Sequence, residues 1–367
     1  MPSPKIDTID QLHAYLRSAM QLEHATIPPY LTALYSIIPG TNSDAFHILR
    51  VAAVEEMLHL TLVANVLNAV GGHPDLTYHG FVPEYPAYLP DGETDFQVSR
   101  QRFSKEAIDT FLNIERPRRA PAEDARLINR GPQQANRLAV SPEEPELQFY
   151  SIGEFYAEIE QGLRHLHGEM GDALFCGDPA RQVKPDYFYS GGGEIIVVTD
   201  LTSALAALRL IAEQGEGFGG GIFDMRHELA HYYRFQQLVL GRFYIKGDQP
   251  DHPTGPPVNV DWDASYPMPK DVSIADYPEG SELRSAAVQF NASYADFLAL
   301  LTSAYNGQPE LLIDAVVRMF QLRDAMFRLL RNPIPGRDGA TGAPTFEVAG
   351  AAAIGAPAAS GSAAVTR

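Results

Sequence analysis

The chain has a single cysteine, Cys176, among its 367 residues. One thiol cannot form a disulfide within the chain, and it cannot supply the several sulfur ligands of a Cys-rich zinc or iron–sulfur site. Basic residues are also scarce, because 28 Lys and Arg stand against 46 Asp and Glu, for a net charge of −18. Binding to nucleic acid and to anionic lipid both depend on clustered positive charge, so we expect neither partner.

Long apolar runs are absent as well. The sequence contains no stretch of about 18 apolar residues, so we expect no membrane-spanning helix. The first ten residues, MPSPKIDTID, lack the basic and then apolar segments of a secretory signal, and we therefore expect a cytoplasmic protein. Signals for strands are weak throughout, although a hydrophobic content of 45% is ordinary for a globular protein with a sizeable core.

What the chain does contain is a series of apolar stripes with helical spacing. They predict helices over residues 8–38, 43–70, 151–175, 200–216, 224–243, 281–306 and 308–331. Pro28 and Pro29 fall inside the first helix and should kink it or insert a wide turn. Asp7 or Thr8 can cap its start, and Pro39-Gly40 ends it. The predicted fold class is all-α.

Segments without apolar periodicity separate these helices. Residues 116–146 have almost no aromatic side chains and predict an exposed, mobile loop, and residues 244–280 are rich in Pro and Asp. We expect one domain over residues 1–335, which includes the 116–146 insertion and the C-terminal helices at 281–331. A flexible tail rich in Ala and Gly should follow over residues 336–367.

Charged side chains interrupt the apolar stripes of the first two helices. Glu23 takes a stripe position in the first, and Glu56 and His59, three residues apart, take core positions in the second. Buried carboxylates are unfavourable unless they are paired or bind a metal. Glu23 precedes Pro39 by as many residues as separate Glu56 from Gly40, so an antiparallel hairpin places both glutamates at one height.

A second helix pair repeats this pattern. Glu216 continues the stripe of the 200–216 helix, and Glu228-x-x-His231 lies on the 224–243 helix after a glycine-rich turn. Glu216 and Glu228 lie at similar sequence distances from that turn, which again predicts that they lie at the same height along the helix pair. Glu213 lies one turn before Glu216 and is an alternative to it.

Two helices would thus supply one Glu each, and two would supply Glu-x-x-His. That set is typical of bundles that bind two iron or manganese ions. The candidate metal ligands are Glu23, Glu56, His59, Glu216, Glu228 and His231, with Glu213 in place of Glu216 as the alternative. Donors rich in oxygen, with one imidazole per metal, favour two Fe ions and also fit Mn.

The letters HELAH at 227–231 also match the zinc hydrolase motif, in which His227 and His231 lie one turn apart on a helix. The extended form of that motif has Gly and His further on, and the sequence continues HYYRFQQL instead. The second helix has Glu55 where a matching histidine would stand. A zinc hydrolase is therefore the weaker interpretation of this segment.

Six segments carry a resemblance to a known family: LEHATIPPYL (22–31), EEMLHL (55–60), SIGEFY (151–156), EQGEG (213–217), HELAHYYRF (227–235) and FNASYADFLALL (290–301). They resemble the ferritin-like family that includes the iminophenylpyruvate dimer synthases of bisindole pigment biosynthesis. The resemblance covers most of residues 8–331. It implies a ferritin-like four-helix bundle with additional C-terminal helices and long loop insertions, and a role in oxidative natural-product metabolism.

These observations together predict a non-haem di-iron oxidoreductase that uses O₂ on a small organic amine, imine or amino-acid-derived substrate. Its partners would be that substrate and O₂, with an electron-donor protein and a second copy of the chain as further candidates. The alternative is a ferroxidase or another metal-handling protein. Storage cages use short self-assembling bundles, so the insertions and extra helices favour the enzyme.

Overall fold

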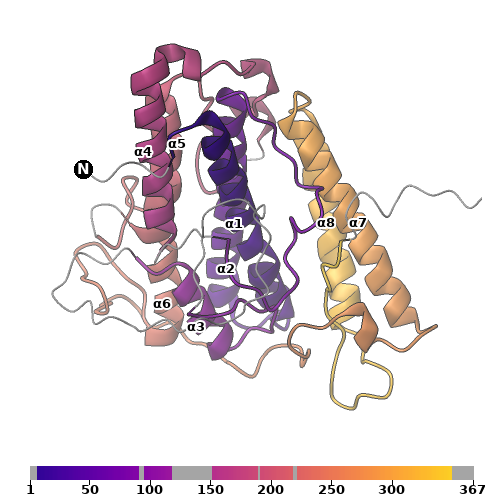
Figure 1. The fold of residues 1–367 in the computed structure, drawn as a ribbon. Coiled ribbons are helices and arrows are strands. Elements are labelled where there is room, and N and C mark those ends of the chain that lie inside the picture. The colour runs from indigo at the N-terminus through magenta and orange to yellow at the C-terminus, as the bar shows by residue number, and fades with distance from the viewer. Residues whose placement is uncertain (1–5, 91–94, 118–150, 189–190, 218–220, 349–367) are drawn as a thin grey trace, which may run out of the picture.

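The computed structural model describes residues 6–90, 95–117, 151–188, 191–217 and 221–348, and within these ranges it contains helices and no strands. The predicted all-α class is confirmed. The α-helices, shown in Figure 1, are α1 (Ile9–Ser36), α2 (Ser43–Ala69), α3 (Lys105–Ile114), α4 (Ile152–Met170), α5 (Leu201–Glu216), α6 (His231–Leu240), α7 (Glu282–Tyr305) and α8 (Leu311–Leu330).

Helices α1 and α2 form the long antiparallel hairpin at the centre of the molecule (Figure 1). Thr8 caps α1 in a reciprocal arrangement with Gln11, as a capping box requires. The helix continues through Pro28 and Pro29. Pro29 has no N–H to give to the carbonyl of Ala25, and the Tyr85 hydroxyl donates to that carbonyl instead, at 2.8 Å. This hydrogen bond satisfies the carbonyl that Pro29 leaves without its helical partner.

Two further columns of helix stand beside the α1–α2 hairpin and complete the bundle. Each column consists of two shorter helices with a break between them. Helix α4 packs against α5, and α3 packs against α6. Figure 1 shows the α4–α5 pair above the α3–α6 pair, both beside the α1–α2 hairpin. The C-terminal end of α3 and the N-terminal end of α4 therefore form one break, and the ends of α5 and α6 form the other. Both breaks lie beside the middle of α1 and α2, where Glu23 and Glu56 are found.

Helices α7 and α8 form a separate hairpin on the opposite side of α1 and α2 (Figure 1). Two buried hydroxyls attach it to the bundle. Tyr294 contacts His24 Nε2 at 2.7 Å, and Tyr305 contacts the Thr61 hydroxyl at 3.0 Å. The predicted helices over 281–306 and 308–331 correspond to this hairpin.

The predicted flexible tail is wrong for its first part. Ala343, Thr345 and Phe346 are buried, because the Tyr277 hydroxyl donates to the Ala343 carbonyl and Phe346 packs edge-on against Phe290. Residues 349–367 lie outside the described residues, and so does the predicted 116–146 loop from residue 118 onward.

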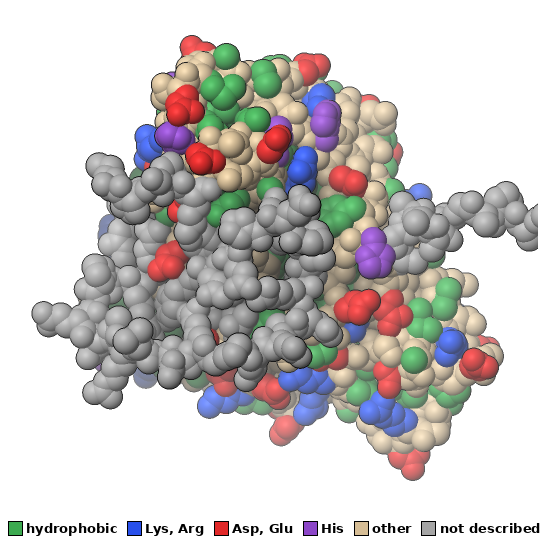
Figure 2. All heavy atoms as spheres, viewed as in Figure 1, with side chains coloured by type: hydrophobic (Ala, Val, Ile, Leu, Met, Phe, Trp, Pro, Cys, Tyr) green, Lys and Arg blue, Asp and Glu red, His purple; other side chains and the backbone are tan. Residues whose placement is uncertain are grey.

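Among the described residues, no helix is both long and apolar enough to cross a membrane. On the face shown in Figure 2, Asp and Glu side chains lie scattered among Lys and Arg side chains over the described part of the chain. Among the described residues visible on that face, the negative charges are therefore not gathered at one place.

Candidate metal centre

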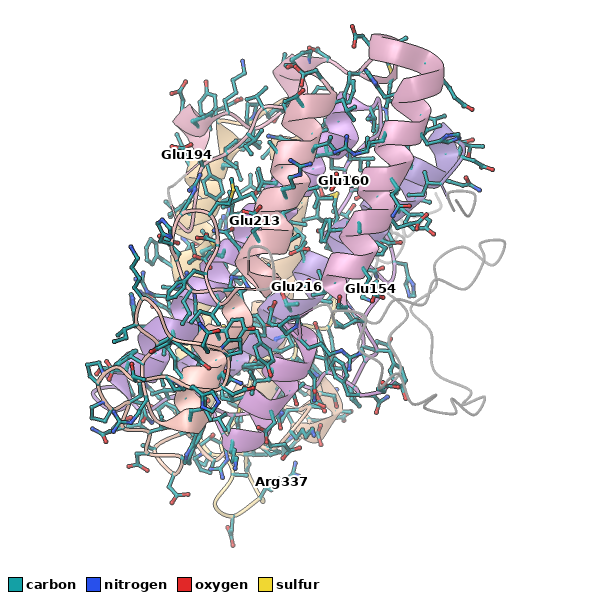
Figure 3. All side chains as sticks on the ribbon, turned by 90° about the vertical axis from the view of Figure 1, so that its left-hand side faces the viewer. Glu154, Glu160, Glu194, Glu213, Glu216 and Arg337 are labelled. Atoms are coloured by element: carbon teal, nitrogen blue, oxygen red, sulfur yellow. The ribbon has the colours of Figure 1, made fainter. Side chains whose placement is uncertain are left out.

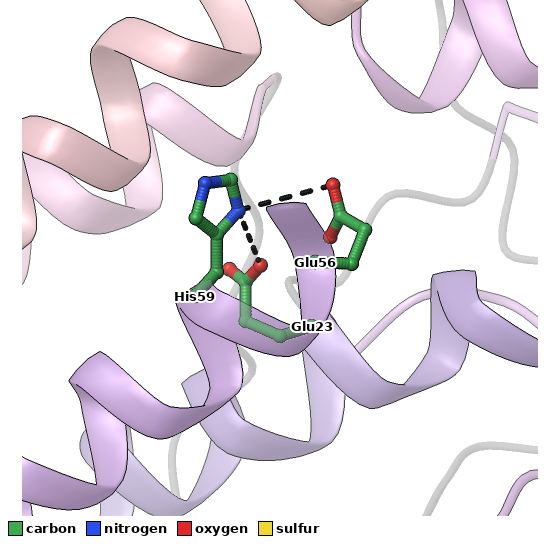
Figure 4. Close-up of side chains that lie close together, drawn as sticks. All are labelled: Glu23, Glu56 and His59. Carbon is green, nitrogen blue, oxygen red and sulfur yellow. Dashed lines mark ion pairs between the residues drawn. The ribbon is translucent and has the colours of Figure 1, made fainter. Parts of the chain in front are cut away.

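Glu23, Glu56 and His59 meet inside the bundle, as the sequence predicted for the α1–α2 hairpin. His59 Nδ1 lies 3.2 Å from Glu23 Oε2 and 3.8 Å from Glu56 Oε1 (Figure 4). All three side chains are almost completely buried. One potential ligand atom from each falls within 4.8 Å of the others, which is close enough for a shared metal ion. We call this group the Glu23 position.

A second group shares Glu56 with the first. His231, at the first residue of α6, places Nδ1 3.0 Å from Glu56 Oε1 and 3.5 Å from Glu115 Oε1. Glu115 is the residue that ends α3. The ligand atoms of Glu56, Glu115 and His231 again lie within 4.8 Å of one another. We call this group the Glu115 position. The two groups are adjacent, with the His59 and His231 ring centroids 5.5 Å apart.

Each carboxylate that belongs to one position only has a tyrosine hydroxyl as its hydrogen-bond donor. Tyr156, on α4, donates to Glu23. Tyr30, on α1, donates to Glu115 at 2.5 Å. Burial, reinforced by the nearby carboxylates, raises the pKa of both tyrosines well above 10, so the hydroxyls keep their protons and act as donors. The shared Glu56 accepts from the Thr26 hydroxyl at 3.1 Å.

The outer nitrogens of the two imidazoles are also held. His231 Nε2 lies 2.7 Å from Glu55 Oε2, and His59 Nε2 lies 2.9 Å from Gln214 Oε1. The amide nitrogen of Gln214 donates to the Gly192 carbonyl, so its oxygen must be the atom that faces His59. Both partners accept only, and both Nε2 atoms therefore carry the proton. When the second proton of each ring is displaced, Nδ1 then turns a free lone pair toward the centre.

The geometry at His231 Nδ1 fits a metal ligand. This fully buried atom is near two carboxylates, yet it makes no hydrogen bond of acceptable geometry with them. An imidazole whose Nε2–H donates outward and whose Nδ1 points at carboxylate oxygens is the usual arrangement of a metal-binding histidine. The donor set therefore fits two divalent ions that share Glu56, with one imidazole at each position.

Without metal, protons neutralise part of this charge. Burial, aided by the charge of Glu115, raises the pKa of Glu56. Burial alone would lower the pKa of both histidines, but the carboxylates around them outweigh it and raise both values. The centre thus favours positive charge, which either protons or metal ions can provide.

Glu216 and Glu213 do not join this cluster. The Glu216 carboxylate accepts from the backbone N–H of Gly153 at 2.8 Å, which ties the end of α5 to the start of α4. Figure 3 shows Glu216 and Glu154 at these neighbouring helix ends and Glu213 further along α5. Glu213 is partly buried, and burial raises its pKa. It is Gln214, between the two, that faces His59.

The predicted 224–243 helix is wrong at its start, because α6 begins only at His231. Residues 224–230 form a turn in which the Asp224 carboxylate accepts from the N–H groups of Arg226 and Glu228, both at 2.8 Å. The Glu228 side chain is 52% exposed and lies 3.5 Å from Arg234. Glu228 and His231 therefore do not share a helix face.

The same turn separates the two histidines of HELAH. His227 is exposed and has a positive φ of 63°, which no helical residue adopts. Since a zinc hydrolase needs both histidines on one helix, the structure does not support that interpretation.

Glu115 is the potential ligand that sequence reasoning missed, because residues 101–115 had no predicted helix. A signal was present. Ser104 caps α3 by accepting from the Ala107 N–H at 3.1 Å, and Ala107, Ile108, Phe111 and Ile114 form a buried stripe. Recognition of that short amphipathic helix would have placed Glu115 at its end.

We expect Glu115→Gln to weaken binding of one metal ion by at least about ten-fold, since even changes beyond the direct ligands have that effect. Glu216→Gln is the matched control, because the amide oxygen can still accept from Gly153. Bound metal would be measured by elemental analysis after dialysis against a defined metal buffer. Equal loss of bound metal in both variants, or greater loss in Glu216→Gln, would indicate that Glu216 is a metal ligand.

Comparisons with known proteins agree with this architecture. A family model described as Ferritin-like matches residues 16–240, which is more than half of the chain and runs from within α1 to the end of α6. A ferritin-like protein from Caulobacter vibrioides, solved by crystallography, has the same fold, with a TM-score of 0.60 and 23% identity over 92% of this chain and 99% of that chain.

A named relative is dichlorochromopyrrolate synthase from Lentzea aerocolonigenes. It is 28% identical over 338 residues, which covers 81% of this chain and 29% of the relative. The chain thus spans less than a third of that protein's length. The family match rests on the helices that carry the buried glutamates and histidines, and the fold agrees with it. The chain belongs to the Ferritin-like family.

Proposed function

We propose that this protein is a non-haem di-iron oxidoreductase that uses O₂ to oxidise a small organic amine, imine or amino-acid-derived substrate in natural-product biosynthesis. The observation that carries the proposal is the pair of buried groups, the Glu23 and Glu115 positions, with Glu56 common to both. Such carboxylate-rich sites with one histidine each are typical of di-iron bundles.

The charges of the centre support two divalent ions. Glu23, Glu56 and Glu115 bring three negative charges against four positive ones, so the bound pair would keep a small positive excess. A bound pair of ferrous ions would supply electrons for the reduction of O₂. Three carboxylates and two imidazoles leave room in the coordination of both ions for O₂ or substrate atoms.

The protein's own side chains would hold this centre rigid and dry. Tyr156 and Tyr30 orient the carboxylates of Glu23 and Glu115, while Gln214 and Glu55 orient the two imidazoles. The candidate ligands are each at most 4% exposed. Such burial excludes bulk water, which strengthens electrostatic interactions and limits side reactions.

A surface cleft offers a way toward this buried centre. It has a volume of about 160 Å³, lies between α4 and α5, and is lined in part by Gly153, Tyr156, Glu213 and Glu216. Tyr156 is one of the residues that line the cleft, and its hydroxyl donates to Glu23, so the cleft and the centre share this residue. The cleft is smaller than most small-molecule sites, but its glutamates outnumber its one arginine, Arg209, and would attract a protonated amine.

The relative's name supports a biosynthetic role, because dichlorochromopyrrolate synthase is named for the compound that it makes. The family resemblance of the sequence supports an amine, imine or amino-acid-derived substrate. An electron-donor protein would complete the cycle if the substrate does not provide all the electrons that O₂ requires.

Counting the iron that the protein oxidises tests this function against metal storage. Ferrous iron is titrated into the protein without O₂, air is admitted, and oxidised iron is counted per chain. We expect the count to reach a plateau at about two irons per chain, which is the number that a two-metal carboxylate site binds. Candidate amines and imines are then screened for faster O₂ consumption. Uptake of many irons per chain, with large symmetric shells, would support a ferroxidase or store instead.

A further inference from the structure

The two metal positions are built alike in their direct contacts. Each combines the shared Glu56, one carboxylate of its own and one imidazole Nδ1. Each separate carboxylate, Glu23 or Glu115, accepts from a buried tyrosine hydroxyl. If the protein binds two metal ions as proposed, the described part of the chain can set a difference in affinity between the positions through the residues that lie behind these direct ligands.

The difference lies behind the histidines. His231 Nε2 donates to the carboxylate of Glu55, which is 1% exposed. His59 Nε2 donates to the neutral amide of Gln214, whose own N–H bonds the Gly192 carbonyl. One imidazole therefore has an anionic partner, and the other has a neutral one.

Arg234 keeps the anionic partner in place. Its guanidinium lies 3.3 Å from Glu55 Oε1 and 3.5 Å from Glu228 Oε2, while its Nε donates to the Leu229 carbonyl. Glu228, predicted as a ligand, is in this arrangement the outer end of a chain of charges that leads through Arg234 and Glu55 to His231. Because Glu228 offsets the charge of Arg234, the three groups together still present one negative charge.

An anionic acceptor at Nε2 draws the N–H proton toward itself and makes Nδ1 a stronger electron donor. It also adds an attractive charge near a bound cation, in an interior where such interactions are weakly screened. A neutral amide does neither to the same degree. Both effects favour metal at the His231 side.

We propose that the Glu115 position, through the Glu55–Arg234 pair behind His231, binds divalent metal about ten-fold or more tightly than the Glu23 position. The two positions are then filled in order, and the metal at the Glu23 position is the one that exchanges readily. Glu55 is in this proposal a positioning residue, since it acts through His231.

The test compares proteins that keep one position each, which removes repulsion between two bound ions. His59→Ala leaves the Glu115 position, and His231→Ala leaves the Glu23 position. Both are titrated with Co²⁺ alone, followed by its visible absorption and by calorimetry, after circular dichroism shows that they are folded. We expect His59→Ala to bind Co²⁺ about ten-fold or more tightly than His231→Ala.

A second change assigns the cause to Glu55. Adding Glu55→Gln to His59→Ala should weaken Co²⁺ binding about ten-fold, whereas adding it to His231→Ala should change binding by less than about two-fold. Glu213→Gln is the matched control, because it removes a carboxylate of α5 that touches neither imidazole. It should leave both single-position affinities nearly unchanged.

The unaltered protein provides a measurement that does not depend on any variant. Crystals grown with one Co²⁺ per chain should show anomalous density concentrated beside His231 and Glu115. Density concentrated beside His59 and Glu23, equal occupancy of both, or equal weakening of both positions by Glu55→Gln would overturn the proposed order. If no position binds Co²⁺, the di-metal function itself is wrong, and the order fails with it.

Discussion

Adding Mn²⁺ to the metal-free protein is expected to raise its melting temperature by about 5–10 °C at pH 8 and by much less at pH 6. A ligand that binds only the folded state stabilises it by about 2.7 kcal/mol per site at a hundred times its Kd. Two such sites, in a chain of this size, give a shift of that order. Mn²⁺ replaces iron here because it does not react with O₂ during heating.

The pH dependence follows from the groups that surround the centre. Burial and the charge of Glu115 raise the pKa of Glu56 from 4.5 to about 8. Between these values the folded protein holds a proton that the unfolded chain has lost, so the metal-free protein loses stability as pH rises, by about 1.4 kcal/mol per pH unit.

His59 and His231 act in the same direction. The nearby carboxylates outweigh burial and raise both pKa values, so these histidines stabilise the metal-free fold most at low pH and lose that contribution as pH rises through the folded values. Metal must displace these protons to bind. At pH 6 it competes with the Glu56 proton as well, whereas at pH 8 about half of the Glu56 carboxyls have already lost theirs, given a pKa of about 8.

Differential scanning calorimetry at the two pH values measures both shifts, with Mg²⁺ as the control for general ionic effects. Equal shifts at pH 6 and pH 8 would mean that no protons leave when metal binds. The absence of any shift would mean that the buried acids do not form a metal site.

Glu23, Glu56 and His59 lie together as the sequence predicted because they belong to a continuous hairpin. Helices α1 and α2 were expected over 8–38 and 43–70 and lie at Ile9–Ser36 and Ser43–Ala69. In an unbroken antiparallel helix pair, the number of residues between a side chain and the turn fixes its height along the helix axis. Counting residues was therefore enough to predict that Glu23 lies beside Glu56. Two features made the boundaries readable: the cap at Thr8 and the Pro-Gly turn.

Counting residues failed for the second pair because neither of the other columns is continuous. Glu216 ends α5, and 14 residues, 217–230, separate it from the start of α6. Once a column is broken, the offset from a glycine turn no longer fixes height or direction. Glu216 instead accepts from Gly153 across the gap, and Glu228 turns toward Arg234.

The breaks also explain why Glu115, and not Glu216 or Glu228, lies beside His231 and Glu56. A side chain at a helix end can turn into the space where the column is interrupted. Glu115 ends α3, and His231 begins α6. A spacing such as Glu-x-x-His predicts a shared helix face only where the helix spans the whole motif, as it does for Glu56 and His59 and does not for Glu228 and His231.

Glu56→Gln is expected to have the largest effect on metal content, because Glu56 is, among the residues that the structure describes, the only side chain common to both positions. We expect bound metal to fall from about two ions per chain to well below one, whereas Glu23→Gln, which changes one position, should retain about one. The amide has the shape of a protonated Glu56 and can still contact Thr26, so the fold should be kept. Elemental analysis and calorimetry are run on all three proteins.

The same variant should be more stable than the wild type when both lack metal at pH 8. At that pH about half of the Glu56 carboxyls are ionised beside Glu115 and Glu23, given a pKa of about 8, and the neutral amide removes their repulsion. The advantage should shrink at pH 6, where Glu56 already holds its proton. Glu213→Gln, which alters a carboxylate that is only partly buried and lies outside the cluster, should show a smaller gain. If Glu56→Gln kept two metal ions, Glu56 could not be the shared ligand, and the two positions would have to be independent sites.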